Sequence, residues 1–442
     1  DEALATAGLA RDAYEALADT RATLQTTALL GRIEMKRGHW DEAAVLLERG
    51  LANLDPSSDP ATYARLAAEF ARTHMVNYRN AEGAAWADRA LAAAGPLRRV
   101  DIIAEAMNTR GVCLQYLGRL DEGIASIRAS VDLAATHHLS SAELRARFNL
   151  AGRLTTEDPT EAMEVLRIGL EVARRNGRRD WLIRLSHFLA TALITFGLDH
   201  DAALAILDEL PEADMPPEEL GESIVNRARV MAFRGDRTAW ARGMTEARAL
   251  TAGLSSPQRQ WDWAASATDV AIAEGRLADA ARESQAIGGN WSGWRMATRA
   301  RIALRSRDLE SARIAISSPE LPAEMGAVWD LWRLGFGAGV AGLEGRREEA
   351  VAGYLESVRL ARQMGALMLA ADLLLDAVCV LGPDDPATAG FADEARGLFT
   401  AAGALAQLDR LDEALGTPLR RASASAATKP AGEGAAIGGS GR

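Results

Sequence analysis

The chain has 442 residues, of which 48% are hydrophobic and 25% charged, and its 50 basic and 61 acidic side chains give a formal net charge of -11. These values are typical of a soluble folded protein, and the acidic balance argues against a nucleic-acid partner, which needs a basic surface. Cys113 and Cys379 lie far apart, so neither a disulfide nor a zinc site is expected. No apolar run reaches the ~18 residues of a membrane span, and we expect a cytoplasmic protein without membrane contact.

One short pattern recurs along the chain at a spacing close to 40 residues. A clear copy is Gly38-His39-Trp40-Asp41-Glu42-Ala43. A near-constant period over most of a chain is typical of a stacked array, in which each unit buries its apolar face against its neighbours. Other clear copies begin at Gly118, Gly275 and Gly345, and weaker ones at Arg79, Glu157, Gly197, Gly235, Ser306 and Gly382.

The chain begins in the middle of this repeat. Asp1-Glu2-Ala3 precedes the equivalent Asp41-Glu42-Ala43 by one period, so we expect residue 1 to open the second helix of a unit. This phase predicts that the chain was cut from a longer polypeptide, whose catalytic or effector part lies upstream of Asp1.

Residues 22–54 show what one unit contains. Small and apolar residues form a helical stripe up to Ile33, and Gly38 is typical of a helix C-terminus. Asp41 and Glu42 favour the start of a second helix, whose apolar face includes Leu47 and Leu51. Each unit is therefore predicted to be an antiparallel pair of helices, and no segment shows the alternation of a strand.

The repeat ends near residue 415. A last helix is expected up to Leu415, where Gly416 and Pro418 stop it. Residues 416–442 are rich in Ala, Gly, Ser and Pro without apolar periodicity, and they are predicted to be disordered.

The spacing of small residues within a unit resembles the tetratricopeptide repeat. Ala follows the anchor Gly by five residues, and a small residue precedes the anchor by seven, as at Gly31, Gly111, Ala190 and Ala228. The usual unit has about 34 residues. This longer form is similar to the C-terminal sensor region of bacterial signal-transduction ATPases, such as the maltose-system transcription activator and its cyclase-linked and kinase-linked relatives. Over residues 1–415 the resemblance implies an all-α, right-handed superhelix of about ten tandem helix pairs.

Motifs for catalysis are weak. No phosphate-binding GxxxxGK[ST] sequence occurs. The run 337–342 matches GxGxxG, but it falls in a predicted first helix, where small residues favour close packing. His137 and His138 have no third ligand at metal spacing. We therefore expect no catalytic residues, no metal and no cofactor.

Tryptophan is concentrated in one part of the chain. Seven of the ten tryptophans lie between positions 240 and 332, beside the one short interval between anchors, from Gly275 to Ser306. An aromatic lining for a ligand is one interpretation, and packing between helices is the other, especially for Trp263, Trp294 and Trp332. The lining would consist of Trp261, Trp291 and Trp329, with Asp262 and Arg295 beside them, and the short interval is the favoured ligand or hinge site.

Polar residues recur on the inner side of the predicted first helices. In repeats of this type, the positions about 13, 10 and 6 before each anchor line the concave groove. This band of groups is suited to a polar ligand or a peptide, and an ordinary solvated face is the alternative. The candidates are Asn108, Arg147, Arg184, His187, Asn226, Arg229, Asp262 and Asp269.

These features predict a non-catalytic regulatory region of a larger bacterial signalling ATPase or transcription regulator. A protein or peptide partner, a small-molecule inducer, or both would bind in the concave groove and bias the attached ATPase or effector domain. A free-standing scaffold that joins two proteins is one alternative. The C-terminal part of a nucleotide cyclase or kinase with an ATPase domain is another.

Overall fold

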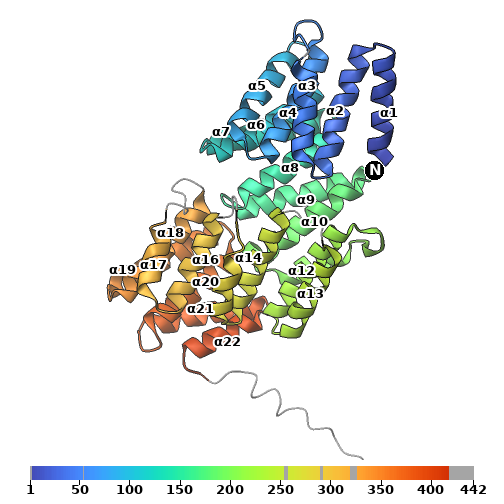
Figure 1. The fold of residues 1–442 in the computed structure, drawn as a ribbon. Helices are drawn as coiled ribbons and strands as arrows, with labels where there is room; N and C mark the ends of the chain where they lie inside the picture. The colour runs from blue at the N-terminus through green and yellow to red at the C-terminus, as the bar shows by residue number, and fades with distance from the viewer. Residues whose placement is uncertain (1, 53, 253–256, 289–291, 319–325, 418–442) are drawn as a thin grey trace, which may run out of the picture.

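The computed structural model describes residues 2–52, 54–252, 257–288, 292–318 and 326–417, and within these ranges the chain forms helices and their connections (Figure 1). Ten helix pairs follow one another in this part of the chain. The first helices are α2 (Thr20–Lys36), α4 (Pro60–Val76), α6 (Val100–Tyr116), α8 (Ser140–Leu154), α10 (Arg179–Ala192), α12 (Pro217–Phe233), α14 (Pro257–Ala273), α16 (Ser292–Arg305), α18 (Ala327–Leu343) and α20 (Leu367–Leu381).

Each first helix is followed by an antiparallel second helix. The second helices are α3 (Trp40–Ala52), α5 (Asn80–Ala94), α7 (Leu120–Thr136), α9 (Pro159–Arg175), α11 (His200–Asp208), α13 (Arg237–Leu250), α15 (Leu277–Ser284), α17 (Leu309–Ile316), α19 (Arg347–Gln363) and α21 (Thr388–Ala401). Helix α1 (Glu2–Ala16) precedes the first pair and α22 (Leu405–Ala414) follows the last. A π-helical turn, η1 (Leu193–Gly197), extends α10, and a 3-10 turn, η2 (Glu212–Asp214), precedes α12. The predicted all-α array of helix pairs is confirmed. The predicted tail lies outside the described residues, except for Gly416 and Thr417.

In nine of the ten pairs the turn between the two helices contains a left-handed residue, and the α8–α9 turn contains none. Glycine takes this conformation at Gly38 and Gly118, with φ of 82° and 79°. In three units the left-handed residue is instead Tyr78, Leu198 or Arg307. The anchors predicted for these units, Arg79, Gly197 and Ser306, are each one residue away from the left-handed residue. The displacement arises because the left-handed position is not occupied by glycine in these units.

Small residues let the two helices of a pair approach closely. A Cβ at Gly111 would lie 2.7 Å from the carbonyl oxygen of Gly123, and a Cβ at Gly123 would lie 2.7 Å from that of Gly111. The backbones of α6 and α7 thus cross at these two glycines, which explains the small residue seven positions before the anchor.

The second half of the array folds back on itself. The amide of Val328 donates to the carbonyl of Thr156 at 3.0 Å, and the hydroxyl of Thr160 donates to the carbonyl of Met364 at 3.0 Å. Helix α22 contacts α12 and α14, and α20 contacts η1. The last helices therefore occupy the inner side of the middle pairs (Figure 1).

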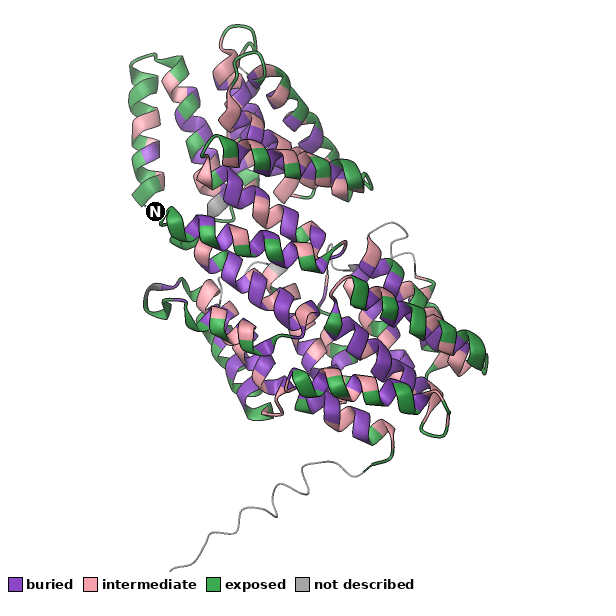
Figure 2. Cartoon of the chain, turned by 180° about the vertical axis from the view of Figure 1, so that it is seen from behind, coloured by how far each residue is buried: buried purple, intermediate pink, exposed green. Residues whose placement is uncertain are grey.

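The hydrophobic core follows this division. One continuous cluster of buried residues extends from Ile127 to Leu411, and Figure 2 shows its buried faces turned inward through the lower half of the molecule. The N-terminal pairs are held by smaller clusters, such as the one that joins Leu24, Leu47 and Phe70. Among the helices of the described residues, none is both long and apolar enough to cross a membrane.

Candidate functional site

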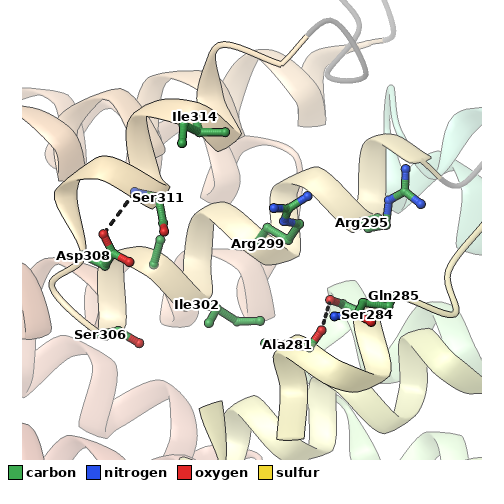
Figure 3. A pocket seen from close by; sticks show the side chains of 11 residues that line it. Ala281, Ser284, Gln285, Arg295, Arg299, Ile302, Ser306, Asp308, Ser311 and Ile314 are labelled. Carbon is green, nitrogen blue, oxygen red and sulfur yellow. Dashed lines mark hydrogen bonds between the residues drawn. The ribbon is translucent and has the colours of Figure 1, made fainter. Parts of the chain in front are cut away.

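Two consecutive second helices are short and leave a hollow on the outer side of the array. Helices α15 and α17 have 8 residues each, whereas α13 before them has 14 and α19 after them has 17. Among the described residues, the outer side of α16 between them is therefore left partly uncovered, at the short interval that the sequence singled out. The hollow measures ≈ 590 Å³ and is lined by Ala281, Ser284, Gln285, Arg295, Arg299, Ile302, Ala303, Ser306, Asp308, Ser311 and Ile314 (Figure 3).

The chemistry of this hollow is basic with an apolar edge. Arg295 and Arg299 lie on successive turns of α16 (Figure 3). A guanidinium nitrogen of Arg295 donates to the carbonyl of Ile287 at 3.3 Å. Asp308 at the start of α17 adds one negative charge to the lining, and its carboxylate accepts from the amide of Ser311 at 3.0 Å (Figure 3). Ile314 leaves 56% of its surface exposed beside them. The arrangement is suited to a carboxylate together with an apolar side chain.

The tryptophans of α16 and α18 form a packed cluster. The ring centroids of Trp294 and Trp332 are 4.7 Å apart and those of Trp329 and Trp332 are 5.1 Å apart, all nearly perpendicular. Trp329 is 1% exposed, which favours the packing interpretation at that position. Trp291 lies outside the described residues. Trp261 is half-buried, with its indole nitrogen against the backbone of Gly288.

The inner faces of α10, α12 and α14 carry a connected polar cluster. His187 places Nδ1 3.3 Å from a carboxylate oxygen of Glu219 and Nε2 2.7 Å from the hydroxyl of Ser223. Arg184 lies on the same carboxylate at 3.7 Å, and so does Arg259. Burial raises the pKa of Glu219, but the hydrogen bond from His187 and the two arginines outweigh it, so the pKa is lowered overall.

Asn226 and Asp262 belong to the same cluster. The Asn226 amide donates to Glu222 at 3.3 Å and accepts from the Thr191 hydroxyl at 3.2 Å. Asp262 keeps a buried carboxylate oxygen without a hydrogen-bond partner in the described structure. Burial, with the nearby charge of Glu222, raises the pKa of Asp262 to about 8. Four of the predicted residues, Arg184, His187, Asn226 and Asp262, therefore lie together on this inner face.

The two N-terminal candidates lie apart from this cluster. Asn108 is buried and accepts from the Asn149 amide at 3.1 Å. Arg147 donates to Glu143 at 2.9 Å within α8. The inner-face arginine of α8 is Arg145, which donates to the carbonyl of Glu105 on α6 at 2.8 Å. The sequence missed it because the inner positions of a first helix are counted back from the glycine of the following turn. The α8–α9 turn has no glycine, so the count along α8 selected Arg147 in place of Arg145.

A buried ion-pair network ties α16 to α20. Arg305 donates to Asp376 at 2.6 Å and to Asp372 at 3.0 Å, and Arg301 reaches the same two carboxylates at 3.2 and 3.0 Å. The side chains of Arg305 and Asp376 are 3% and 0% exposed. The sequence contained a signal for this network that the prediction did not use. Asp372 and Asp376 are the two charged residues of the otherwise apolar helix 367–381, and such residues need buried partners.

Next to this network lies a small cavity of ≈ 50 Å³ that is partly open to solvent. It contains two of the predicted residues, Arg229 and Asp269, which pair at 2.6 Å. Several polar atoms of the residues that line it have no hydrogen-bond partner in the described structure, including both amide atoms of Gln407. Each such buried group costs about 1–3 kcal/mol. Nothing in the repeat pattern pointed to Gln407, because α22 has no copy of the anchor.

Comparison with known proteins adds little to this geometry. No protein-family model matches the chain, and no curated protein matches it. Among solved structures it is similar to the yeast Tom70 crystal structure, with 11% identity, 88% of each chain covered and a TM-score of 0.29. It is also similar to a circular tandem repeat protein with novel repeat topology, with 17% identity, 93% of each chain covered and a TM-score of 0.15. Values this low carry no functional argument.

The fold defines the chain as an all-helical protein built of tandem antiparallel helix pairs. Across the described ranges, no group of three or more His, Cys, Asp or Glu side chains is placed to hold a metal ion.

Proposed function

We propose that this chain is a non-catalytic binding scaffold, and that the hollow over α16 takes an acidic, partly apolar helical segment of a partner protein. The observation that carries this proposal is the shortness of both α15 and α17. Because each neighbouring second helix is nearly twice as long or longer, a docked helix would occupy the space that their missing turns leave open. Helix-in-groove binding of this kind is a common mode of peptide recognition.

Charge and size support this occupant. Arg295 and Arg299 form a basic spot on a chain of net charge -11. An acidic side chain of the partner would be attracted there and repelled from most of the remaining surface. The apolar edge at Ile302 and Ile314 would receive a leucine or isoleucine one helical turn away. A volume of ≈ 590 Å³ lies within the usual range for a binding site.

The binding segment can be tested with a fluorescent helical peptide that carries glutamate and leucine at i and i+4 spacing. Arg299→Glu is expected to weaken binding at least tenfold in fluorescence anisotropy. Arg359→Glu, at an exposed position of α19 away from the hollow, is the matched control and leaves the affinity unchanged. Absence of binding at millimolar peptide, or equal loss in both variants, contradicts the proposal.

The biological role that we propose is that of a regulatory sensor region of a signalling ATPase or transcription regulator. Support comes from the resemblance of the long repeat to such regions. A partner or inducer that prefers one curvature of the array would shift the state of an attached effector domain. The free-standing scaffold and the cyclase- or kinase-linked protein are the alternatives.

The coding sequence upstream of Asp1 distinguishes these roles. A phosphate-binding loop there supports the ATPase, and a cyclase or kinase domain supports that alternative. A start codon directly before Asp1 supports the free-standing scaffold and rules out an upstream effector.

A further inference from the structure

The cavity beside the ion-pair network is created by the fold-back of the C-terminal helices. Its wall comes from α12, α14, α16 and α18 on one side and from α20 and α22 on the other, with Thr195 of η1 at one edge. Asp269 keeps 40% of its side chain accessible, whereas Asp372 is 13% exposed. Asp269 therefore marks the mouth of the cavity, and Asp372 lies deeper.

The residues that line the cavity carry buried hydrogen-bond donors and acceptors without a partner in the described part of the chain. Gln407 is 1% exposed, and neither its oxygen nor its nitrogen has a partner in the described part of the chain. The same holds for Nε of Arg229, one terminal nitrogen of Arg301 and the indole nitrogen of Trp332. Buried polar groups in folded proteins are nearly always satisfied by protein, ordered water or a ligand. Five unsatisfied atoms on residues lining one cavity therefore indicate an occupant.

The charges on the wall indicate what kind of occupant. Two guanidinium groups, Arg229 and Arg301, present unused donors suited to a carboxylate. Two carboxylates, Asp269 and Asp372, are suited to an ammonium group. Desolvation by the surrounding helices and the charge of Asp372 raise the pKa of Asp269 against the opposing charge of Arg229, and a cation between the two carboxylates would lower it again. Formal charges on these four groups cancel, so the cavity favours a molecule with no net charge.

The size of the cavity limits the molecule. One water needs roughly 10–15 Å³ on this measure, so ≈ 50 Å³ holds the equivalent of about four waters. The remaining wall is aromatic and apolar, with Trp332, Phe336 and Met368. A short hydrocarbon part would lie against these side chains.

We propose that this cavity is a binding site for a small zwitterion, a free amino acid of the size of glycine or alanine. Its ammonium group lies between Asp269 and Asp372. Its carboxylate accepts from Arg229, Arg301 and the Gln407 amide. The site is separate from the hollow over α16, and the inference does not depend on the proposed docking of a partner there.

Such a ligand would act as a bridge between the two sides of the fold-back. It would contact α12 and α14 on the inner face and α20 and α22 on the returning helices. Since a ligand stabilises the state that binds it, occupancy would favour the folded-back arrangement of the C-terminal helices.

Calorimetry and thermal unfolding of the full chain with glycine and L-alanine test the proposal. Either amino acid at millimolar concentration is expected to release or absorb heat and to raise the Tm. Acetate and ethylamine, which carry one charge each, are expected to have no effect at the same concentration. Absence of any effect of glycine and alanine up to 10 mM would mean that water alone fills the cavity, and it would overturn the proposal.

Variants place the binding in this cavity. Gln407→Leu is expected to weaken glycine binding at least tenfold and to unfold at the same or a higher temperature without ligand, because it removes the unsatisfied amide. Gln363→Leu, at an exposed position of α19, is the control. Asp269→Asn, at the accessible mouth, gives a second test if Gln407→Leu does not fold. Unchanged glycine affinity in a folded variant of either position refutes the site.

The two proposed sites fail independently. Arg299→Glu leaves glycine binding intact, and Gln407→Leu leaves the acidic peptide bound with the same affinity. If one variant abolished both activities, the assignment of amino-acid binding to this cavity would be wrong.

Discussion

Removing the carboxylate of Asp376 should disrupt the attachment of α20 to α16. The side chain is fully buried and accepts from Arg305 at 2.6 Å and from Arg301 at 3.2 Å. In Asp376→Ala, both guanidinium groups stay buried with Asp372 as their remaining partner. Breaking a buried pair on one side costs about 3–5 kcal/mol, and the remaining carboxylate favours the lower end, near 3 kcal/mol. That value corresponds to a more than hundredfold change in the folded-to-unfolded ratio.

Urea unfolding monitored by tryptophan fluorescence measures this loss, because Trp294, Trp329 and Trp332 lie in the same half of the molecule. With a urea dependence of about 3 kcal/mol per molar, the midpoint should fall by about 1 M. Arg305→Met combined with Asp376→Leu should restore much of the stability, because no buried charge is left partly paired.

Glu356→Ala is the control for this experiment. Glu356 pairs with Arg359 on the surface of α19, where both side chains are about half exposed, and its removal should cost less than about 1 kcal/mol. If Asp376→Ala loses no more than this control, or if the double variant is as unstable as the single one, the network does not hold the two helices together.

Three further changes test the packing and the buried titratable groups. Burial, with the charges of nearby arginines, lowers the pKa of His200 to about 4 from its ordinary 6.5, so its stabilising contribution is complete above pH 6.5 and is lost as the pH falls toward 4. His200→Leu should therefore show a shallower decline of Tm between pH 6.5 and 4.5, and an identical slope would contradict the assignment. Burial of Asp262 raises its pKa to about 8, so the stability that this carboxyl contributes to the folded state is complete below pH 3.8 and is lost as the pH rises toward 8. Asp262→Asn should therefore stabilise the protein at pH 7 by roughly 2–4 kcal/mol in chemical unfolding. A loss of stability would refute this. Gly111→Ala should lower the Tm and cost about 1–3 kcal/mol of stability, because its Cβ would meet the carbonyl of Gly123. Gly397→Ala has open space around the new Cβ and should increase the free energy of unfolding by about 0.5–1 kcal/mol. A gain of stability at both positions would contradict the close crossing of α6 and α7.

The helix pairs were predictable because their signals are local. The glycine at each turn, the acidic residues that follow it and the apolar stripe all lie within one unit, as residues 22–54 illustrate. Where the left-handed residue is Tyr78 or Leu198, the turn was predicted one residue away, since these side chains give no turn signal of their own.

The fold-back was not predictable, because it depends on residues that are far apart in the chain. Thr160 and Met364 meet across 204 positions, and the repeat pattern is the same for an open array and for a closed one. Arg229 and Asp269 were found because they follow the period. Asp372 was missed because a polar residue in an apolar helix identifies a partner only when that partner is known, and Gln407 was missed because α22 has no copy of the anchor.

The closure between residues 156–160 and the segments around Val328 and Met364 sets how the molecule comes apart. An open stack loses stability from its ends, one hairpin at a time. Here the last seven pairs, from α8–α9 to α20–α21, share a single core and are joined at both ends, so they should melt as one cooperative block. The first pairs have only their immediate neighbours and can fray alone. Amide hydrogen exchange should therefore show two levels of protection. Exchange should be slow and uniform from Ile127 to Leu411, and its protection should decrease gradually toward the N-terminus before Ile127.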